Sequence, residues 1–296
     1  MGTGKRRSVA RGIYRALEPL RPDKTGYKTI SSGKPHEIGS HFQIDFDAAH
    51  GAITHLANKN TGRRWASPKN LLALFCYQTF SQADYDRFYR QYIINKRKTA
   101  HWSVDDYTKP GMEAAGQQSG LWNMKLAGLY RSGSRVLVEL VPPKTVTWGC
   151  PRFVTLEYEF SETEPATNLT VQWFDKPASR LPEALWLSFN PIVARAVVWR
   201  MQKMGLDIWP GEVIRQGNRK LHAVENVRYD DGQSRFSIDT LDAPLVAPGE
   251  PSLLNFNSHL PPLSKGMHFN LYNNIWGTNF PMWYDDDARF RFNLHL

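Results

Sequence analysis

The stretch Arg152-Phe-Val-Thr-Leu-Glu-Tyr-Glu-Phe160 alternates between apolar and polar side chains. In an extended chain successive side chains point to opposite faces, so the apolar residues of this stretch share one face and the polar residues share the other. The apolar face carries Val154, Leu156, Tyr158 and Phe160. This period of two predicts a half-buried β-strand.

The same period recurs along most of the chain. Phe42, Ile44 and Phe46 alternate with polar residues, as do Leu169, Val171 and Trp173. Further strands are predicted at 52–56, 71–80, 136–141, 184–189, 194–200, 221–228, 234–240, 267–272 and 288–295. Many short strands with turn residues between them, and no βαβ rhythm, predict an all-β fold in the form of a large antiparallel sandwich.

One helix is predicted within this β pattern, over residues 81–94. Ser81 can cap its first turn, and Asp84 favours the positive end of the helix dipole. Tyr85, Phe88, Tyr89 and Tyr92 recur at helical spacing, and we interpret this aromatic stripe as core packing. Residues 100–120 contain Pro110 and several glycines and are predicted to form a long loop. The fold class is therefore all-β with one or two short helices.

Charge is distributed unevenly over the 296 residues. Residues 1–40 carry a net charge of +6 out of the total of +9. Residues 5–19 can form a short basic helix, and residues 20–40 are rich in Pro, Gly, Ser and Lys, as in a linker. We therefore predict a basic N-terminal arm and linker over 1–40 and a β-sandwich domain over 41–296. Most of the excess positive charge lies in this arm, and the sequence has no nucleic-acid-binding motif, so no nucleic-acid partner is predicted.

The sequence also gives expectations for the cellular compartment and for the state of the two cysteines. No run approaches the roughly 20 apolar residues of a membrane span, so no membrane partner is predicted. The N-terminus has no apolar segment typical of a secretory signal. Cys76 and Cys150 lie in apolar surroundings and are predicted to be buried free thiols. A cytoplasmic location is the expectation.

Motifs of self-contained hydrolases are missing from the sequence. It contains no His-Glu-x-x-His, His-x-His or His-x-Asp, no Gly-x-Ser-x-Gly, no phosphate-binding glycine loop and no Cys-x-x-Cys. The sequence therefore predicts no catalytic residues and no metal ligands in this chain.

The loop after residue 272 is the strongest candidate for a binding site. Amides and a hydroxyl set among indoles suit a sugar, because apolar sugar faces stack on rings and sugar hydroxyls bond to amides. The candidate residues are Asn273, Asn274, Trp276, Thr278 and Asn279, followed by Trp283 and Tyr284. The alternative is that these amides are buried and satisfy irregular backbone.

A second candidate lies in residues 176–186. Arg180 and Glu183 could form a pair at the rim of a pocket, with Trp186 as a stacking platform, or they could pair only to fix a turn before a strand. Residue chemistry favours the structural alternative.

Two other groups of polar residues are weaker candidates. His222 and Glu225 are three positions apart, so on a strand they would point to opposite faces, and a surface histidine is the simpler interpretation. The run Asp285-Asp-Asp287 is predicted to be a solvated turn, or an occasional Ca²⁺ ligand, since adjacent carboxylates do not span a glycosidic bond.

Several of these stretches resemble a known family. Gly51-Ala-Ile-Thr-His-Leu56, followed by Asn60-Thr-Gly-Arg-Arg-Trp65, resembles a hairpin in the C-terminal β domain of glycoside hydrolase family 38 α-mannosidases. Residues 77–88, 176–186 and 273–281 resemble a microbial and fungal group of unknown function, whose full-length members join such a domain to a mannosidase-like barrel. The resemblance covers about residues 40–296. It implies a galactose-mutarotase-like supersandwich, a fold associated with carbohydrate binding.

The differences from the family limit what the resemblance implies. In the mannosidases a preceding barrel supplies zinc, through a His-x-Asp motif among other ligands, and the nucleophilic Asp. This chain has neither the motif nor room for the barrel, so zinc is expected only in the missing barrel and no cofactor is expected here. The chain resembles the C-terminal half of such an enzyme, as a truncated or split product or an accessory domain.

The resemblance and the residues together give the expected function. We expect a domain that binds a carbohydrate of the mannose type through Arg180, Glu183 and the loop residues from Asn273 to Asn279, with a catalytic barrel as a possible partner. The alternatives are a structural or interaction module, whose basic arm docks an acidic partner, and a mutarotase-like isomerase. An isomerase would need a histidine and a carboxylate in one pocket.

Overall fold

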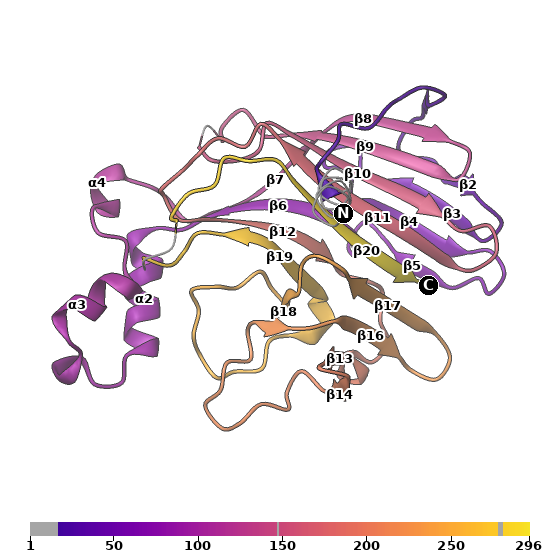
Figure 1. Ribbon diagram of the computed structural model, residues 1–296. Coiled ribbons are helices and arrows are strands. Elements are labelled where there is room, and N and C mark those ends of the chain that lie inside the picture. The colour runs from indigo at the N-terminus through magenta and orange to yellow at the C-terminus, as the bar shows by residue number, and fades with distance from the viewer. Residues whose placement is uncertain (1–16, 147, 278–280) are drawn as a thin grey trace, which may run out of the picture.

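The computed structural model describes residues 17–146, 148–277 and 281–296. Within these ranges the strands form three antiparallel sheets (Figure 1). The predicted all-β antiparallel sandwich is therefore confirmed. In the described part of the chain the largest sheet has ten strands, in the spatial order β1 (Lys28–Thr29), β8 (Lys125–Ser132), β9 (Arg135–Val141), β10 (Phe153–Phe160), β11 (Ala166–Phe174), β20 (Ala288–His295), β17 (Arg235–Thr240), β16 (Asn226–Asp230), β13 (Arg200–Lys203) and β14 (Leu206–Ile208).

Two smaller sheets complete the sandwich over the same described ranges. The six-stranded sheet has the order β15 (His222–Ala223), β18 (Leu245–Pro248), β19 (Met267–Asn273), β12 (Glu183–Phe189), β6 (Leu74–Thr79) and β7 (Gly120–Asn123). The four-stranded sheet has the order β2 (His36–Ile38), β3 (Phe42–Phe46), β4 (Ile53–Asn58) and β5 (Arg64–Ala66).

The main core lies between the ten-stranded sheet and the two smaller ones. Phe42 of β3 packs against Phe160 of β10, with ring centroids 5.6 Å apart. On the other side of the core, Phe269 of β19 packs edge-on against Phe292 of β20, at 5.2 Å. Aromatic pairs of this kind stabilise a core beyond the area that they bury. The apolar face of β10 points into this core, as the alternation predicts.

A second, smaller core covers the opposite face of the six-stranded sheet. It is closed by α2 (Gln82–Tyr92), which buries Tyr85 and Phe88 against the sheet residue Trp186. The interpretation of the aromatic stripe as core packing is confirmed for Tyr85 and Phe88, whereas Tyr92 stays partly exposed. Asp84 accepts a hydrogen bond from the backbone N of Ser81 at 2.8 Å, which fixes the start of the helix.

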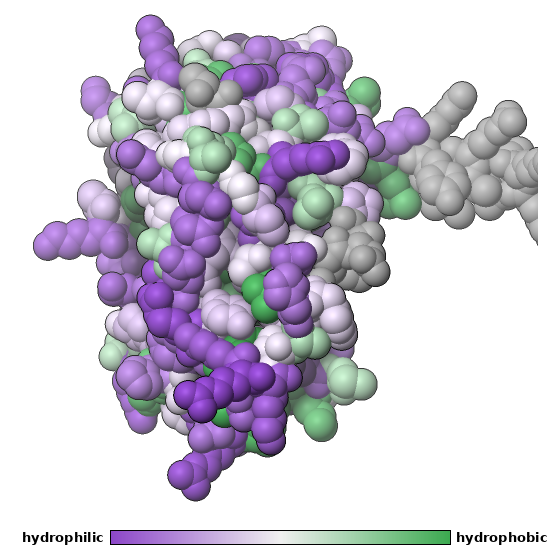
Figure 2. Space-filling view, turned by 90° about the vertical axis from the view of Figure 1, so that its left-hand side faces the viewer, coloured by the Kyte–Doolittle hydropathy of each residue, from purple (hydrophilic) through white to green (hydrophobic). Residues whose placement is uncertain are grey.

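Residues 96–115 contain more helix than the sequence predicts. Instead of one long loop, they form η1 (Lys96–Lys98), α3 (His101–Val104), η2 (Asp105–Tyr107) and α4 (Met112–Ala115). Figure 1 shows α2, α3 and α4 together at one end of the sandwich, and Figure 2 shows that the face seen from that end carries mainly hydrophilic side chains. The remaining short helices of the described chain are η3 (Ala196–Val198) and η4 (Leu263–Lys265).

The segment predicted as a linker lies against the ten-stranded sheet. The backbone of Leu20 exchanges two hydrogen bonds with the side chain of Gln172, at 2.9 and 3.0 Å. The guanidinium of Arg21 lies 4.8 Å from the ring centroid of Phe174. β1 and β2, which lie in the same segment, each pair with a sheet. The predicted basic helix over 5–19 lies almost wholly outside the described residues.

Two further properties bear on the sequence predictions. Cys76 and Cys150 are both free and buried, as predicted. In the described ranges no helix combines the length and the apolar character that a membrane crossing requires.

Candidate functional site

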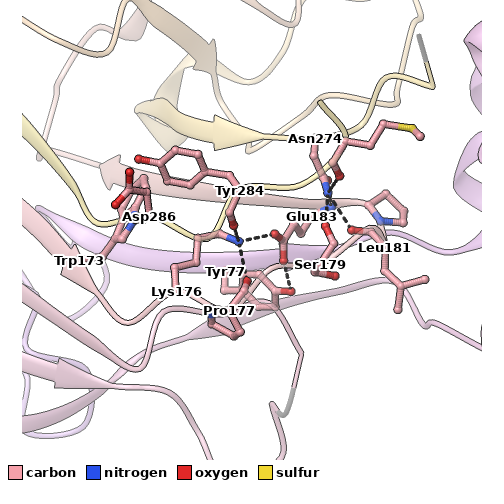
Figure 3. Close-up of polar contacts among 12 residues, drawn as sticks. Tyr77, Trp173, Lys176, Pro177, Ser179, Leu181, Glu183, Asn274, Tyr284 and Asp286 are labelled. Atoms are coloured by element: carbon pink, nitrogen blue, oxygen red, sulfur yellow. Dashed lines mark hydrogen bonds and ion pairs between the residues drawn. The ribbon is translucent and has the colours of Figure 1, made fainter. Parts of the chain in front are cut away.

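A buried ion pair occupies the centre of the candidate site. Glu183 begins β12 and is completely buried. Its Oε1 accepts a hydrogen bond from Nζ of Lys176 at 2.5 Å, and its Oε2 accepts one from the hydroxyl of Tyr77 at 2.7 Å (Figure 3). Lys176 also donates to the carbonyl oxygen of Tyr284 at 3.0 Å. The network therefore ties the loop before β12 to β6 and to the loop before β20.

The environment of Glu183 explains why the pair holds together. Burial raises the pKa of the Glu183 carboxyl, and the charge and hydrogen bond of Lys176 oppose this rise. Burial and the adjacent carboxylate also raise the pKa of the Tyr77 hydroxyl. Tyr77 is therefore a hydrogen-bond donor at neutral pH, and both carboxylate oxygens of Glu183 have a partner.

The predicted pairing of Arg180 with Glu183 is not found. Arg180 is exposed, and its guanidinium carbon lies 4.5 Å from the ring centroid of Trp283. Lys176 takes the place beside Glu183 instead. The buried position beside Glu183 goes to a lysine whose amine also reaches the carbonyl oxygen of Tyr284.

Asn274 is a structural amide in this arrangement. Its Oδ1 accepts from the backbone N of Glu183 at 2.7 Å. Its Nδ2 donates to the carbonyl oxygens of Ser179, Leu181 and Met282, at 3.0, 3.1 and 3.0 Å (Figure 3). Because both polar atoms are occupied by backbone, this side chain joins the two loops and leaves no free donor for a ligand.

The other predicted loop residues have different surroundings. Asn273 donates to Oδ1 of Asn270 at 2.7 Å. Trp276 is 47% exposed, with its ring 5.9 Å from that of Phe88. Thr278 and Asn279 lie outside the described residues.

A pocket of about 420 Å³ lies beside the ion-pair network. Its walls come from the helical segment around η2 and α4, from the loop before β12 and from the loop after β19. The lining residues that matter here are Asp105, Lys109, Arg180, Leu181, Gly277 and Met282. Among the predicted site residues that the structure describes, Arg180 lines this pocket, while Glu183 and Asn274 are buried.

Close packing holds this wall of the pocket in place. A Cβ atom added to Gly277 would lie 2.4 Å from the carbonyl oxygen of Asp105 and 2.5 Å from that of Thr108. Real Cβ atoms do not approach backbone oxygens so closely, so only glycine lets the loop after β19 lie against η2.

Lys109, like Tyr77 and Lys176, was not among the candidate residues that the sequence indicated. It is 7% exposed, and its Nζ is buried without a hydrogen-bond partner in the described part of the structure. Burial lowers the pKa of this amine to about 8, although the charge of Glu183 acts in the opposite direction. Lys109 lies in the segment predicted as a loop, and no sequence pattern distinguished it from other lysines.

The weaker candidates do not form an acid–base pair. His222 is buried, not on the surface as predicted, and burial lowers its pKa to about 4. Glu225 instead accepts a hydrogen bond from the backbone N of Gly205 at 3.3 Å. Asp285 and Asp286 are exposed, as expected for a solvated turn. Within the described ranges no group of three or more His, Cys, Asp or Glu side chains is placed to hold a metal ion.

Comparison with models of known protein families identifies the family of this chain. The sequence profile of a domain of unknown function, DUF5054, matches residues 3–168, which is more than half of the chain. The chain belongs to the DUF5054 family. The matched part of this DUF5054 protein includes Lys109 and Tyr77, whereas Arg180, Glu183 and the loop after β19 follow it. No curated protein matches the sequence.

Solved structures resemble this DUF5054 protein in fold. An alpha-mannosidase from Enterococcus faecalis V583 superposes with a TM-score of 0.51 and 8% identity, covering 93% of this chain and 30% of that one. The chain thus spans less than a third of the length of that enzyme. A galactose mutarotase-like protein from Lactobacillus casei ATCC 334 gives a TM-score of 0.45 and 10% identity, covering 88% and 100% of the two chains. At such identities the likeness to the mannosidase concerns the fold alone.

Proposed function

We propose that this protein is a carbohydrate-binding domain, and that the pocket lined by Arg180 and Lys109 is its ligand site. The observation that carries the proposal is the exposed indole of Trp283, which contacts Arg180, a residue that lines this pocket. Trp283 is 43% exposed and lies under the guanidinium of Arg180. An indole next to charged hydrogen-bond donors suits a sugar, whose ring has apolar faces and polar edges.

The dimensions and rigidity of the pocket support the proposal. Its volume of about 420 Å³ falls within the range typical of small-molecule sites. Its walls are held by Asn274, which bonds three backbone carbonyls, and by Gly277, which contacts η2 closely. A preformed site loses less conformational freedom when it binds a ligand.

Binding is tested by calorimetric titration of the purified chain with mannose and manno-oligosaccharides. We expect saturable binding, and we expect Trp283→Ala to weaken it by about tenfold or more, as removal of an aromatic hot spot does. The matched control is Trp102→Ala, because Trp102 is an exposed indole in α3, 74% exposed, whereas Trp283 is the indole that contacts the pocket residue Arg180. No heat of binding for any sugar, or equal loss in both variants, would contradict the proposal.

As a second candidate we propose that the domain acts beside a catalytic domain of the mannosidase type. The observation that favours this is the coverage of the Enterococcus alpha-mannosidase, in which the matched fold is 30% of a longer chain. We expect no turnover of an aryl α-mannoside by the purified chain, with or without added zinc. Turnover that a chelator abolishes would contradict this proposal, since it would require a metal site within the chain itself.

A further inference from the structure

A buried lysine lines the pocket. Lys109 is buried and its Nζ has no hydrogen-bond partner in the described ranges of the structure. An unpaired ammonium away from water costs free energy, and buried lysines are normally paired. The charge of Glu183 acts on Lys109 from a distance, but in the described residues no hydrogen bond joins the two, and the Glu183 oxygens bond to Lys176 and Tyr77. A ligand that carries an anion would supply the missing partner.

Arg180 provides a second cation at the same pocket. Arg180 lines it, and the ring of Trp283 at 4.5 Å positions the guanidinium. The planar fork of a guanidinium matches the two oxygens of a carboxylate better than an ammonium does. Lys109 and Arg180 thus both line the pocket, the first with its amine buried and the second exposed.

The local charge indicates a ligand with a single negative charge. Lys109, Lys176 and Arg180 contribute three positive charges, against one negative charge each from Glu183 and Asp105, the acidic residue that lines the pocket. The excess is one positive charge, which a carboxylate neutralises. A phosphate, with a charge of about −1.5 to −2 at pH 7, would leave an excess of negative charge.

We infer that this pocket binds the carboxylate of an acidic sugar, a hexuronic acid, through Lys109 and Arg180. The inference rests on the proposed carbohydrate-binding function and makes its ligand class specific. The sugar ring would lie against Trp283, while its carboxylate would pair with Lys109 and Arg180.

Calorimetric titration of the full chain with sodium mannuronate, mannose, mannose 6-phosphate and acetate tests this inference. We expect mannuronate to bind at least about tenfold more tightly than mannose, a difference of about 1.4 kcal/mol. We expect acetate, which has no sugar ring, and mannose 6-phosphate to bind more weakly than mannuronate. Higher salt should weaken the binding of mannuronate more than that of mannose.

Variants separate the contributions of the two cations. Lys109→Met and Arg180→Met should each reduce the preference for mannuronate over mannose by about tenfold, as expected when a charged hydrogen bond is lost. Arg180 is exposed, so its variant tests the inference even if Lys109→Met alters the fold. The matched control is Lys125→Met, which removes an exposed lysine from β8 of the ten-stranded sheet.

The possible outcomes distinguish this inference from the proposed function. Equal affinity for mannuronate and mannose, unchanged in both pocket variants, would overturn the inference and leave carbohydrate binding in place. Tighter binding of mannose 6-phosphate would overturn the choice of a carboxylate. Absence of binding by every sugar would overturn the proposed function as well.

Discussion

The carboxylate of Glu183 and the amine of Lys176 meet at 2.5 Å with both side chains fully buried. This pair lies beneath the pocket and joins the loop before β12 to the strand itself. Because a buried charge without a partner is far more costly than a buried pair, the two residues are interdependent. The pair therefore contributes to the conformation of the loop that carries Arg180, one wall of the proposed site.

Removal of Lys176 should strongly destabilise the protein. Lys176→Met leaves the Glu183 carboxylate buried without its cation, and we expect a loss of about 3–5 kcal/mol in the free energy of unfolding. Urea unfolding followed by tryptophan fluorescence measures this change. Lys176→Met combined with Glu183→Gln should recover part of the loss, and Arg180→Met, a change at an exposed residue, should have little effect. A loss below about 1 kcal/mol in Lys176→Met would show that the pair is not structurally important.

A methyl group at residue 149 should press on the same carboxylate. A Cβ added to Gly149 would lie 1.9 Å from Oε2 of Glu183, which is held in place by Tyr77. We expect Gly149→Ala to lower the free energy of unfolding by about 1–3 kcal/mol, the usual cost of overpacking.

A double-mutant cycle identifies the cause of that cost. In a Glu183→Ala background the carboxylate is absent, so Gly149→Ala should cost clearly less than in the wild-type background. Equal costs in both backgrounds would show that the glycine is required for another reason.

Two buried histidines should make the fold sensitive to mild acid. Burial lowers the pKa values of His222 and His268 to about 4, from an ordinary value of 6.5. The unfolded chain therefore takes up protons first as the pH falls, and stability is lost between about pH 6.5 and pH 4. Each histidine can contribute on the order of 3 kcal/mol to this loss.

Urea midpoints at pH 7, 6 and 5 measure this dependence in the wild type and in His222→Gln and His268→Gln. Each variant should show a flatter dependence on pH than the wild type. Glu183 acts in the opposite direction, because its pKa is raised and its protonation favours the folded state as the pH falls. The comparison of variants with the wild type removes this shared contribution, and equal slopes in all three proteins would contradict the prediction.

Lys109 should reduce stability at neutral pH. Burial lowers its pKa to about 8, so the unfolded state holds this proton more tightly than the folded state. Stability should rise as the pH increases from about 8 toward 10.5, because the folded lysine then becomes neutral. At pH 7 the penalty is fully present, and Lys109→Met should stabilise the protein by up to about 3 kcal/mol.

Thermal or urea unfolding at pH 7 and pH 9.5 checks this prediction. The advantage of Lys109→Met over the wild type should shrink at the higher pH, while Lys125→Met should show no such change. A variant that gains stability but loses its preference for mannuronate would indicate that the buried amine is kept for binding. No gain at pH 7 would show that the amine is already compensated in the folded protein.

Local periodicity was sufficient to predict much of the fold. The strands predicted around Phe42, Val154 and Phe290 coincide with β3, β10 and β20. Alternation of side chains is a property of the extended chain itself, so it is readable wherever one face of a strand is buried. The start of α2 after Ser81 could also be predicted from local sequence, because a capping box involves residues only three positions apart.

Local periodicity failed where structure depends on contacts between distant segments. The predicted strand over 194–200 is instead η3, with β13 beginning at Arg200. The segment over 20–40 resembles a linker in composition, yet its residues bond to Gln172 and pair with strands of two sheets. Proline and glycine content indicates turns, but it does not report which surface an irregular segment lies against.

The sequence by itself determined the fold class and the buried free thiols, and it indicated Arg180, Glu183 and Asn274 as candidate site residues. Only the tertiary structure decided which of them face a cavity: Arg180 does, whereas Glu183 and Asn274 are occupied inside the protein. The tertiary structure also places Lys109, which is more than 70 residues before Arg180 in the chain, in the lining of the same pocket. The physical reason is that strand alternation is set by neighbouring residues, whereas the partner of a buried charge is set by how the sheets bring distant loops together.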